Sequence, residues 1–251
     1  MENKAAKVLE CYALCNSLKN VVRTGWKDWH VNRERVESIA EHVYGVQMLA
    51  ILMHSTYEYD LDLKKVIMML AVHEMEEILM GDLTLFDIDR DIKGIIGHKA
   101  VEAALKNFIN KDEIKALIYE FDERKTPEAK FAYYCDKLEC DIQSKLYDEE
   151  GCVDLNNQEG NNTLEDPTVQ ELLASGMTWS QMWLEFWRRR CPYDKNFIEV
   201  SKYASSHPIS VNPKEYAKDN GIIDLLEYAK THTKEEFFAY VGEEMPNKKA
   251  M

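Results

Sequence analysis

Four polar residues lie at positions where the spacing of apolar residues predicts the buried face of a helix. His42 falls within the apolar stripe of its predicted helix. His73 and Glu74 follow Leu70 by three and four residues, and Asp136 lies in the middle of a third predicted helix. Residues three and four apart share one face of a helix, so we expect these side chains to point inward.

Taken one at a time, these residues fit ordinary roles in a folded protein. A lone inward histidine is more often a hydrogen-bonded core residue than a metal ligand, and a lone aspartate on a helix is usually solvated. Together the four residues favour a metal site more than each does alone, because buried charges are costly unless they are paired or bound to a metal. Two histidines and two carboxylates on three helices form a reasonable ligand set for a divalent cation. From spacing alone, both interpretations stay open.

The elements that must position these residues are predicted to be helices throughout. Apolar residues recur at intervals of three and four, and no long stretch alternates with the period of two that is typical of strands. A capping box of Ser38 and Glu41 predicts the start of one helix. A second helix is predicted from Leu63 to Met80, where Gly81 supplies a favourable C-cap, and a third begins near Pro127, the first proline of the chain. The sequence therefore predicts an all-α helical bundle.

The composition of the chain changes near residue 150. Residues 149–167 are rich in Gly, Asn and acidic residues, which predicts a loop or linker. We expect one domain over residues 1–150 and, over residues 151–251, a linker and a C-terminal helical extension that packs on the core. In that extension Trp179, Trp183 and Trp187 recur every four residues. Such a stripe is more often a core face than a ligand platform.

Composition also narrows the classes of partner. The formal net charge is −14, which argues against DNA or RNA as a partner, because a polymer of phosphates requires a basic face. A small phosphorylated ligand held by a few local cations remains compatible with it. The longest unbroken apolar run, Val66–Val72, is too short to span a membrane. The six cysteines contain no Cys-x-x-Cys pair and predict reduced thiols, so we expect a cytoplasmic protein.

Three motifs occur in order and resemble those of the HD-domain metal-dependent phosphohydrolases. They are Ser-Ile-Ala-Glu-His (38–42), His-Glu-Met-Glu-Glu-Ile-Leu-Met-Gly-Asp (73–82) and Cys-Asp-Lys-Leu-Glu (135–139), with Arg-Thr-Gly-Trp (23–26) upstream. The resemblance covers about residues 7–147, and the closest branch is that of the 5'-deoxynucleotidases. It implies an HD-domain helical bundle that binds one divalent transition-metal cation (Mn²⁺, Co²⁺, Fe²⁺ or Zn²⁺). The residues matching the family's ligands are His42, His73, Glu74 and Asp136.

One position departs from the family pattern. The family dyad is His-Asp, whereas this chain has His73-Glu74. Glutamate is still a hard oxygen ligand but is one methylene longer, so it could reach the same cation after a shift of the helix or the ion, or change the metal preference. A fragment of a zinc-protease helix is an alternative interpretation of His73 to Glu77, but that motif requires a second histidine at position 77.

Three further residues receive roles from the resemblance. Arg23 matches the arginine that binds the substrate phosphate, and arginine can grip phosphate through two parallel hydrogen bonds. Asp82 would face the sugar hydroxyl. Glu77, one turn after His73, is expected to transfer a proton as a general acid or base. The alternatives are a surface charge at a helix end for Arg23, a turn-forming residue for Asp82 and a helix-surface residue for Glu77.

The resemblance implies a hydrolase that releases phosphate from (deoxy)nucleoside 5'-monophosphates. Two other classes stay open: a hydrolase of another phosphoester, such as a diester or a nucleoside triphosphate, and a non-catalytic protein that binds a nucleotide or a partner. In the second class the tryptophan stripe would be the interaction face. The expected partner is a small phosphorylated substrate, with neither a nucleic-acid polymer nor a membrane. An exposed aromatic face and the family comparison also suggest a homodimer.

Overall fold

Helices make up almost all the regular structure in the computed structural model, which describes residues 3–108 and 110–243. Within those ranges there is no strand, only an isolated antiparallel bridge between Val22 and Ser38. This confirms the predicted all-α fold. No helix of the described ranges is long and apolar enough to cross a membrane.

The chain divides into two compact units, one ending at Pro208 and one beginning at Ile209. The α-helices of the first unit are α1 (Lys4–Asn16), α2 (Thr24–Asp28), α3 (Ile39–Tyr57), α4 (Leu63–Val72), α5 (Glu77–Met80), α6 (Arg90–Ala104), α7 (Lys111–Glu123), α8 (Pro127–Glu149), α9 (Pro167–Ala174), α10 (Trp179–Arg190) and α11 (Lys195–Ser206). Its short 3-10 helices are η1 (Ser17–Asn20), η2 (Leu105–Asn107) and η3 (Asn162–Glu165). The second unit contains α12 (Pro213–Asp219), α13 (Ile222–Thr231) and α14 (Lys234–Val241), and each of these helices packs on the next.

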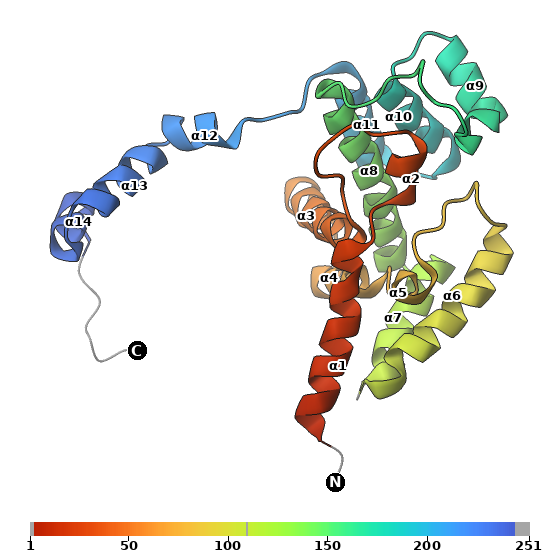
Figure 1. Ribbon diagram of the computed structural model, residues 1–251, viewed down its shortest axis with the longest axis horizontal. Helices are drawn as coiled ribbons and strands as arrows, with labels where there is room; N and C mark the ends of the chain where they lie inside the picture. The colour runs from red at the N-terminus through yellow and green to blue at the C-terminus, as the bar shows by residue number, and fades with distance from the viewer. Residues whose placement is uncertain (1–2, 109, 244–251) are drawn as a thin grey trace. The chain divides into compact units, whose positions relative to one another are not determined.

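Helix α8 is the centre of the first unit (Figure 1). It begins where the sequence predicts, because Thr126 caps its N-terminus and Pro127 occupies a first position that needs no backbone donor. Helices α3, α4, α7, α10 and α11 all pack against it. Residues in the middle of α8 therefore face several other helices at once, which is where the predicted site residue Asp136 lies.

The division at Pro208 differs from the boundary expected near residue 150. Helices α9, α10 and α11 belong to the first unit, and α10 and α11 pack directly on α8. Trp179 is buried in a core cluster, and Trp183 and Trp187 pack against that cluster. The core interpretation of the tryptophan stripe is confirmed for Trp179, whereas Trp183 and Trp187 are half-buried and also line a cavity. None of the three is exposed, so the interpretation of the stripe as an exposed partner face is wrong. The dimer expected from an exposed aromatic face loses that support.

The helix predicted from Leu63 to Met80 is interrupted. Helix α4 ends at Val72, residues 73–76 form a turn, and α5 begins at Glu77. In the turn the Met75 amide donates to the Val72 carbonyl and the Glu77 amide donates to the Glu74 carbonyl, each three residues back. These bonds wind the backbone more tightly than an α-helix does. Helix α5 ends before Gly81, which has a φ of 74°.

Candidate active site

The four predicted ligand residues meet at one point of the first unit. His42 comes from α3, His73 and Glu74 come from the turn after α4, and Asp136 comes from α8. One ligand atom from each of the four lies within 4.8 Å of the others. The structure thus brings together residues that are up to 94 positions apart in the chain.

The distances within this cluster match those around a single cation. His42 Nε2 lies 3.2 Å from Asp136 Oδ1 and 3.6 Å from Glu74 Oε1. His73 Nε2 lies 3.5 Å from Glu74 Oε1 and 4.0 Å from Asp136 Oδ1. Ligand atoms about 2.1 Å from a cation lie roughly 3.0–4.2 Å from one another. The cluster therefore has the donor set and the spacing that a divalent cation requires.

Hydrogen bonds to the other nitrogen of each imidazole orient both histidines. His42 Nδ1 lies 2.6 Å from Glu139 Oε2, and His73 Nδ1 lies 2.8 Å from the Leu70 carbonyl oxygen. Because Nδ1 donates in both cases, Nε2 carries the lone pair when the imidazole is neutral, and this nitrogen points towards the cluster. Nε2 of His73 is buried and has no hydrogen-bond partner among the described residues. Such an orphaned nitrogen is the atom that a metal would satisfy.

The two histidines differ in how their surroundings act on protonation. Burial lowers the pKa of His73, which favours the neutral imidazole that binds a cation. Burial alone would also lower the pKa of His42, but its acidic neighbours outweigh it and raise that pKa well above its usual range. A bound cation and a proton would compete for the same nitrogen of His42.

A glycine makes room for the carboxylate that supports His42. A Cβ atom at Gly45 of α3 would lie 2.2 Å from Glu139 Oε1 of α8, too close for any real contact. Glu139 reaches His42 Nδ1 only because the backbone of α3 carries no side chain there. No role was predicted for either residue. The end of the Cys-Asp-Lys-Leu-Glu motif contains Glu139, and a glycine inside a strongly helical stretch was the available signal for Gly45.

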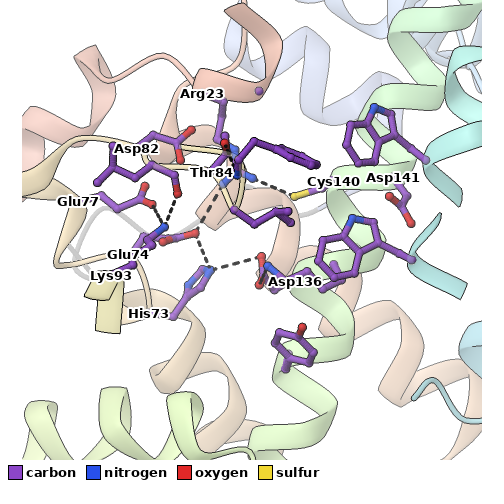
Figure 2. Close-up of a pocket in the computed structure, with 18 of the residues that line it drawn as sticks. Arg23, His73, Glu74, Glu77, Asp82, Thr84, Lys93, Asp136, Cys140 and Asp141 are labelled. Carbon is purple, nitrogen blue, oxygen red and sulfur yellow. Dashed lines mark hydrogen bonds and ion pairs between the residues drawn. The ribbon is translucent and has the colours of Figure 1, made fainter. Parts of the chain in front are cut away.

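Arg23 lies beside the cluster. Its backbone is fixed by the bridge to the start of α3, because the Arg23 amide donates to the Glu37 carbonyl at 3.1 Å. Its NH1 atom is 3.5 Å from Glu74 Oε1, and its NH2 atom donates to Cys140 Sγ at 3.0 Å. In Figure 2 these contacts extend from the guanidinium towards both Glu74 and Cys140. A permanent positive charge therefore borders the ligand cluster.

Asp82 is positioned by contacts with Thr24. Its carboxylate accepts a hydrogen bond from the Thr24 amide, and its carbonyl oxygen accepts one from Thr24 Oγ1 at 2.8 Å. These bonds tie the residue after Gly81 to the residue after Arg23. In the structure, Asp82 therefore fixes the start of α2 beside the cluster. It also lines the cavity described below.

Glu77 is almost completely buried, with 2% of its surface exposed. Burial and the negative charges of Glu74 and Asp82 raise the pKa of Glu77 well above its usual range. Its Oε1 is 3.4 Å from Lys93 Nζ, and its Oε2 has no hydrogen-bond partner among the described residues. The interpretation of Glu77 as a helix-surface residue is thus wrong.

Lys93 was not predicted as part of the site. It comes from α6, and its Nζ also donates to the Leu83 carbonyl oxygen at 2.5 Å. Burial would lower the pKa of Lys93, but the surrounding carboxylates, Glu77 first, outweigh it and raise that pKa. Nothing in the local sequence marks this lysine, because α6 approaches α5 only in the folded chain.

These residues line one cavity of about 550 Å³. Of the seven predicted site residues, the structure places on its wall Arg23, His73, Glu74, Glu77, Asp82 and Asp136. His42 lies behind the wall and is fully buried. Figure 2 shows Glu74, Glu77, Asp82 and Lys93 on one side of the cavity, opposite Asp136, Cys140 and Asp141 of α8. Its volume is typical of a small-molecule site.

One family model and several known proteins are similar to this chain. The HD domain family matches residues 15–173. A 5'-deoxynucleotidase HDDC2 of Xenopus laevis is 31% identical over 149 residues, which cover 57% of this chain and 70% of that protein. The HDDC2 of Mus musculus, also a 5'-deoxynucleotidase by name, is 30% identical over 162 residues, covering 62% of this chain and 74% of that protein.

Two solved structures share the fold. A Pyrococcus horikoshii OT3 protein has a TM-score of 0.55 at 21% identity, covering 78% of this chain and 98% of that chain. A protein of Magnetospirillum magnetotacticum MS-1, described as a predicted metal-dependent phosphohydrolase, also has a TM-score of 0.55 at 21% identity. That match covers 81% of this chain and 94% of that chain.

Proposed function

Since the chain belongs to the HD domain family, we propose that it is a metal-dependent phosphomonoesterase that releases phosphate from (deoxy)nucleoside 5'-monophosphates. The observation that carries the proposal is the convergence of His42, His73, Glu74 and Asp136, with Arg23 at their edge. The names of the curated relatives support a nucleotide as the substrate.

The four clustered residues would hold one divalent cation. Two imidazoles and two carboxylates favour Mn²⁺, Co²⁺, Fe²⁺ or Zn²⁺, whereas Mg²⁺ prefers oxygen ligands and water. When bound, such a cation supplies a Lewis acid that polarises a phosphoryl oxygen and acidifies water. The buried imidazoles, each oriented through its own Nδ1, are preorganised for this role.

Three residues around the cluster would bind the phosphate, transfer a proton and position the substrate. Arg23 would bind the phosphate, because its guanidinium carries a fixed charge and presents several donors at the edge of the cluster. Glu77 would transfer a proton, since its Oε2 has no hydrogen-bond partner within the described part of the chain while Lys93 contacts Oε1. Asp82 would hold Arg23 in place through Thr24 and face the sugar of the substrate.

A substrate screen with restored metal tests the proposal. The metal-stripped protein receives Mn²⁺, Co²⁺, Fe²⁺, Zn²⁺ or Mg²⁺ in turn, together with nucleoside monophosphates, nucleoside triphosphates or a phosphodiester. We expect phosphate release from monophosphates with at least one transition metal. Cleavage of only a diester or a triphosphate would assign the site to another phosphoester. Tight nucleotide binding without turnover under any metal would indicate a binding protein.

A matched pair of arginine variants tests the role of Arg23. Arg23→Ala should raise the KM for a nucleoside monophosphate by about 10-fold or more, because charge-assisted bonds to phosphate are among the stronger hydrogen bonds. Arg33→Ala is the control, since Arg33 is ion-paired with Glu150 and lies outside the cavity. Equal KM values for the two variants would remove Arg23 from phosphate binding. The cytoplasmic location and the homodimer stay predictions.

A further inference from the structure

The cavity has a charged side and an aromatic side. The charged side carries the residues of the proposed hydrolysis. The aromatic side is lined by Trp29, Phe86, Tyr133, Trp183 and Trp187. The ring of Trp183 packs edge-on against Trp29, with 6.0 Å between the centroids, and lies 6.5 Å from Phe86. A ligand with an anionic group at one end and a flat apolar group at the other fits this division.

Helix α8 links the two sides. Its Asp136 belongs to the ligand cluster, and the next residue, Lys137, places Nζ 5.3 Å from the ring centroids of both Tyr133 and Trp187. Asp141 follows Lys137 by four residues and therefore lies on the same face of the helix. Figure 2 shows Asp141 beyond Cys140, away from Glu77, Asp82 and Lys93. Asp141 is thus the acidic residue of the aromatic side.

Asp141 is a buried acid that the proposed hydrolysis does not use. Only 1% of its surface is exposed, and its Oδ2 is buried without a hydrogen-bond partner among the described residues. Burial raises the pKa of Asp141 well above its usual range. A protonated carboxyl presents one donor and one acceptor side by side. Unpaired buried carboxyl groups are costly and are found preferentially at functional sites.

Two of the five aromatic residues of this wall come from a part of the chain that the family match does not reach. Trp183 and Trp187 belong to α10, whereas the HD domain match ends at residue 173. The two curated relatives described above cover 57% and 62% of this chain. Helix α10 thus adds a wall of its own to a cavity whose ligand cluster belongs to the shared domain.

We propose that α10 and Asp141 form a nucleobase subsite, in which the rings of Trp183 and Trp187 cover the base and the Asp141 carboxyl hydrogen-bonds its edge. The proposal rests on the proposed function for the position of the phosphate at the charged side. A nucleobase offers both features that this side requires, a flat π-face for the rings and a donor next to an acceptor for the carboxyl. A purely apolar occupant would leave Asp141 without a partner, and a sugar phosphate would leave the aromatic wall unused.

Nucleoside binding to the metal-free protein tests the subsite without any catalysis. Equilibrium dialysis with each deoxynucleoside measures the Kd of the wild type and its variants. We expect Trp183→Leu and Asp141→Leu to weaken binding of the preferred nucleoside by about 10-fold or more, and Trp183→Phe by less. Asp141→Asn keeps a donor next to an acceptor and should bind within about threefold of the wild type.

The control is Trp179→Phe. Trp179 lies one turn before Trp183 on α10, but it is buried in the core cluster and does not line the cavity. It should bind nucleosides like the wild type. Thermal unfolding followed by circular dichroism identifies any variant that fails to fold. If a leucine variant does not fold, the nucleoside affinities of Asp141→Asn and Trp183→Phe decide the test.

Kinetics supply a second readout. Trp183→Leu and Asp141→Leu should raise the KM for a nucleoside monophosphate by about 10-fold and leave the KM for deoxyribose 5-phosphate unchanged, because that substrate has no base.

The outcomes separate this proposal from the proposed function. Nucleoside binding that depends on Trp183 and Asp141, without hydrolysis of any nucleotide, would support the subsite and refute the hydrolysis. Hydrolysis with an unchanged KM in both leucine variants would overturn the subsite and leave the hydrolysis intact. Absence of nucleoside binding by the wild type, or equal loss in Asp141→Asn and Asp141→Leu, would also overturn the subsite as proposed.

Discussion

The four residues of the ligand cluster come from two kinds of backbone. His42 and Asp136 lie inside the long helices α3 and α8, whereas His73 and Glu74 are neighbours in the turn between α4 and α5. Consecutive residues of an α-helix point about 100° apart. The turn allows His73 Nε2 and Glu74 Oε1 to approach within 3.5 Å. Helices thus fix where the site is, and the turn brings two adjacent side chains to it.

The two pairs also differ in the hydrogen bonds that orient their histidines. His42 depends on Glu139 from another helix, 97 residues away in sequence. His73 is oriented by the Leu70 carbonyl oxygen, only three residues back. The helical pair therefore depends on long-range packing and the turn pair on local backbone geometry. We expect substitutions in the helical pair to have the larger effects.

The largest effect is expected from removing a helical ligand. His42→Ala or Asp136→Ala should abolish stoichiometric cation binding, because each removes one ligand from a different rigid helix. Elemental analysis of the purified protein measures the loss. His54→Ala is the matched control, since His54 is another histidine of α3 but lies outside the cluster. Full metal content in either ligand variant would refute the assigned set.

The next effect concerns the residue that follows the turn. Glu77→Gln should keep the cation and the fold but lower kcat by about 10²-fold or more, the scale of a lost acid–base group. Phosphate release and metal content are measured on the same sample. Unchanged activity would exclude Glu77 from proton transfer, and loss of metal would instead place it among the ligands.

A smaller effect is expected when the support of His42 is disturbed. Gly45→Ala places a Cβ where Glu139 Oε1 now lies, so it should displace that carboxylate and weaken metal affinity by about 10–100-fold. Metal titration followed by calorimetry measures the change. Gly94→Ala of α6 serves as the control, because a Cβ there meets nothing within 4 Å. Equal affinities in the two variants would show that Glu139 does not support the site.

The turn pair is expected to tolerate change better. Glu74→Asp restores the aspartate that the family pattern has at this position, and it should still bind a cation, with a changed preference among Mn²⁺, Co²⁺, Fe²⁺ and Zn²⁺. Glu74→Ala should weaken binding for all four. Competition among these metals, followed by elemental analysis, compares the variants. If Glu74→Ala keeps both affinity and preference, Glu74 is not a ligand.

The smallest effect is on the pH dependence of stability near the helical pair. Burial, reinforced by Glu139, raises the pKa of Glu37 to about 7. An unfolded glutamate has a pKa of about 4.3, so the folded state holds this proton more tightly. The free energy of unfolding should therefore fall as the pH rises from about 4.5 to 7.

Glu37→Gln should reduce that fall, since glutamine does not titrate. Urea unfolding of the metal-free wild type and variant at pH 5 and pH 7.5 measures it. The same pH dependence in both proteins would contradict the assignment to Glu37. The positive charges of His42 and Arg23 lower the pKa of Glu37. The protonation states of these two residues must therefore be the same in the wild type and the variant.

Much of the fold could be predicted because its signals are local. The capping box of Ser38 and Glu41 starts α3, and the proline at the start of α8 lies where predicted. Hydrogen bonds between residues three or four apart determine these features, so a short stretch of sequence contains them. The continuous helix predicted across His73 was wrong, because the spacing of apolar residues does not show where i→i+3 hydrogen bonds replace the α-helical ones.

The sequence by itself determined the helical class, the starts of α3 and α8, and the types of residue that could hold a cation. Only the tertiary structure decided that Glu139 supports His42 through the space left by Gly45, that Lys93 holds Glu77, and that α10 walls the cavity. The physical reason is the range of the interactions. Backbone hydrogen bonds within a helix join near neighbours, whereas these contacts depend on how closely separate helices approach, which side-chain packing sets across the whole unit.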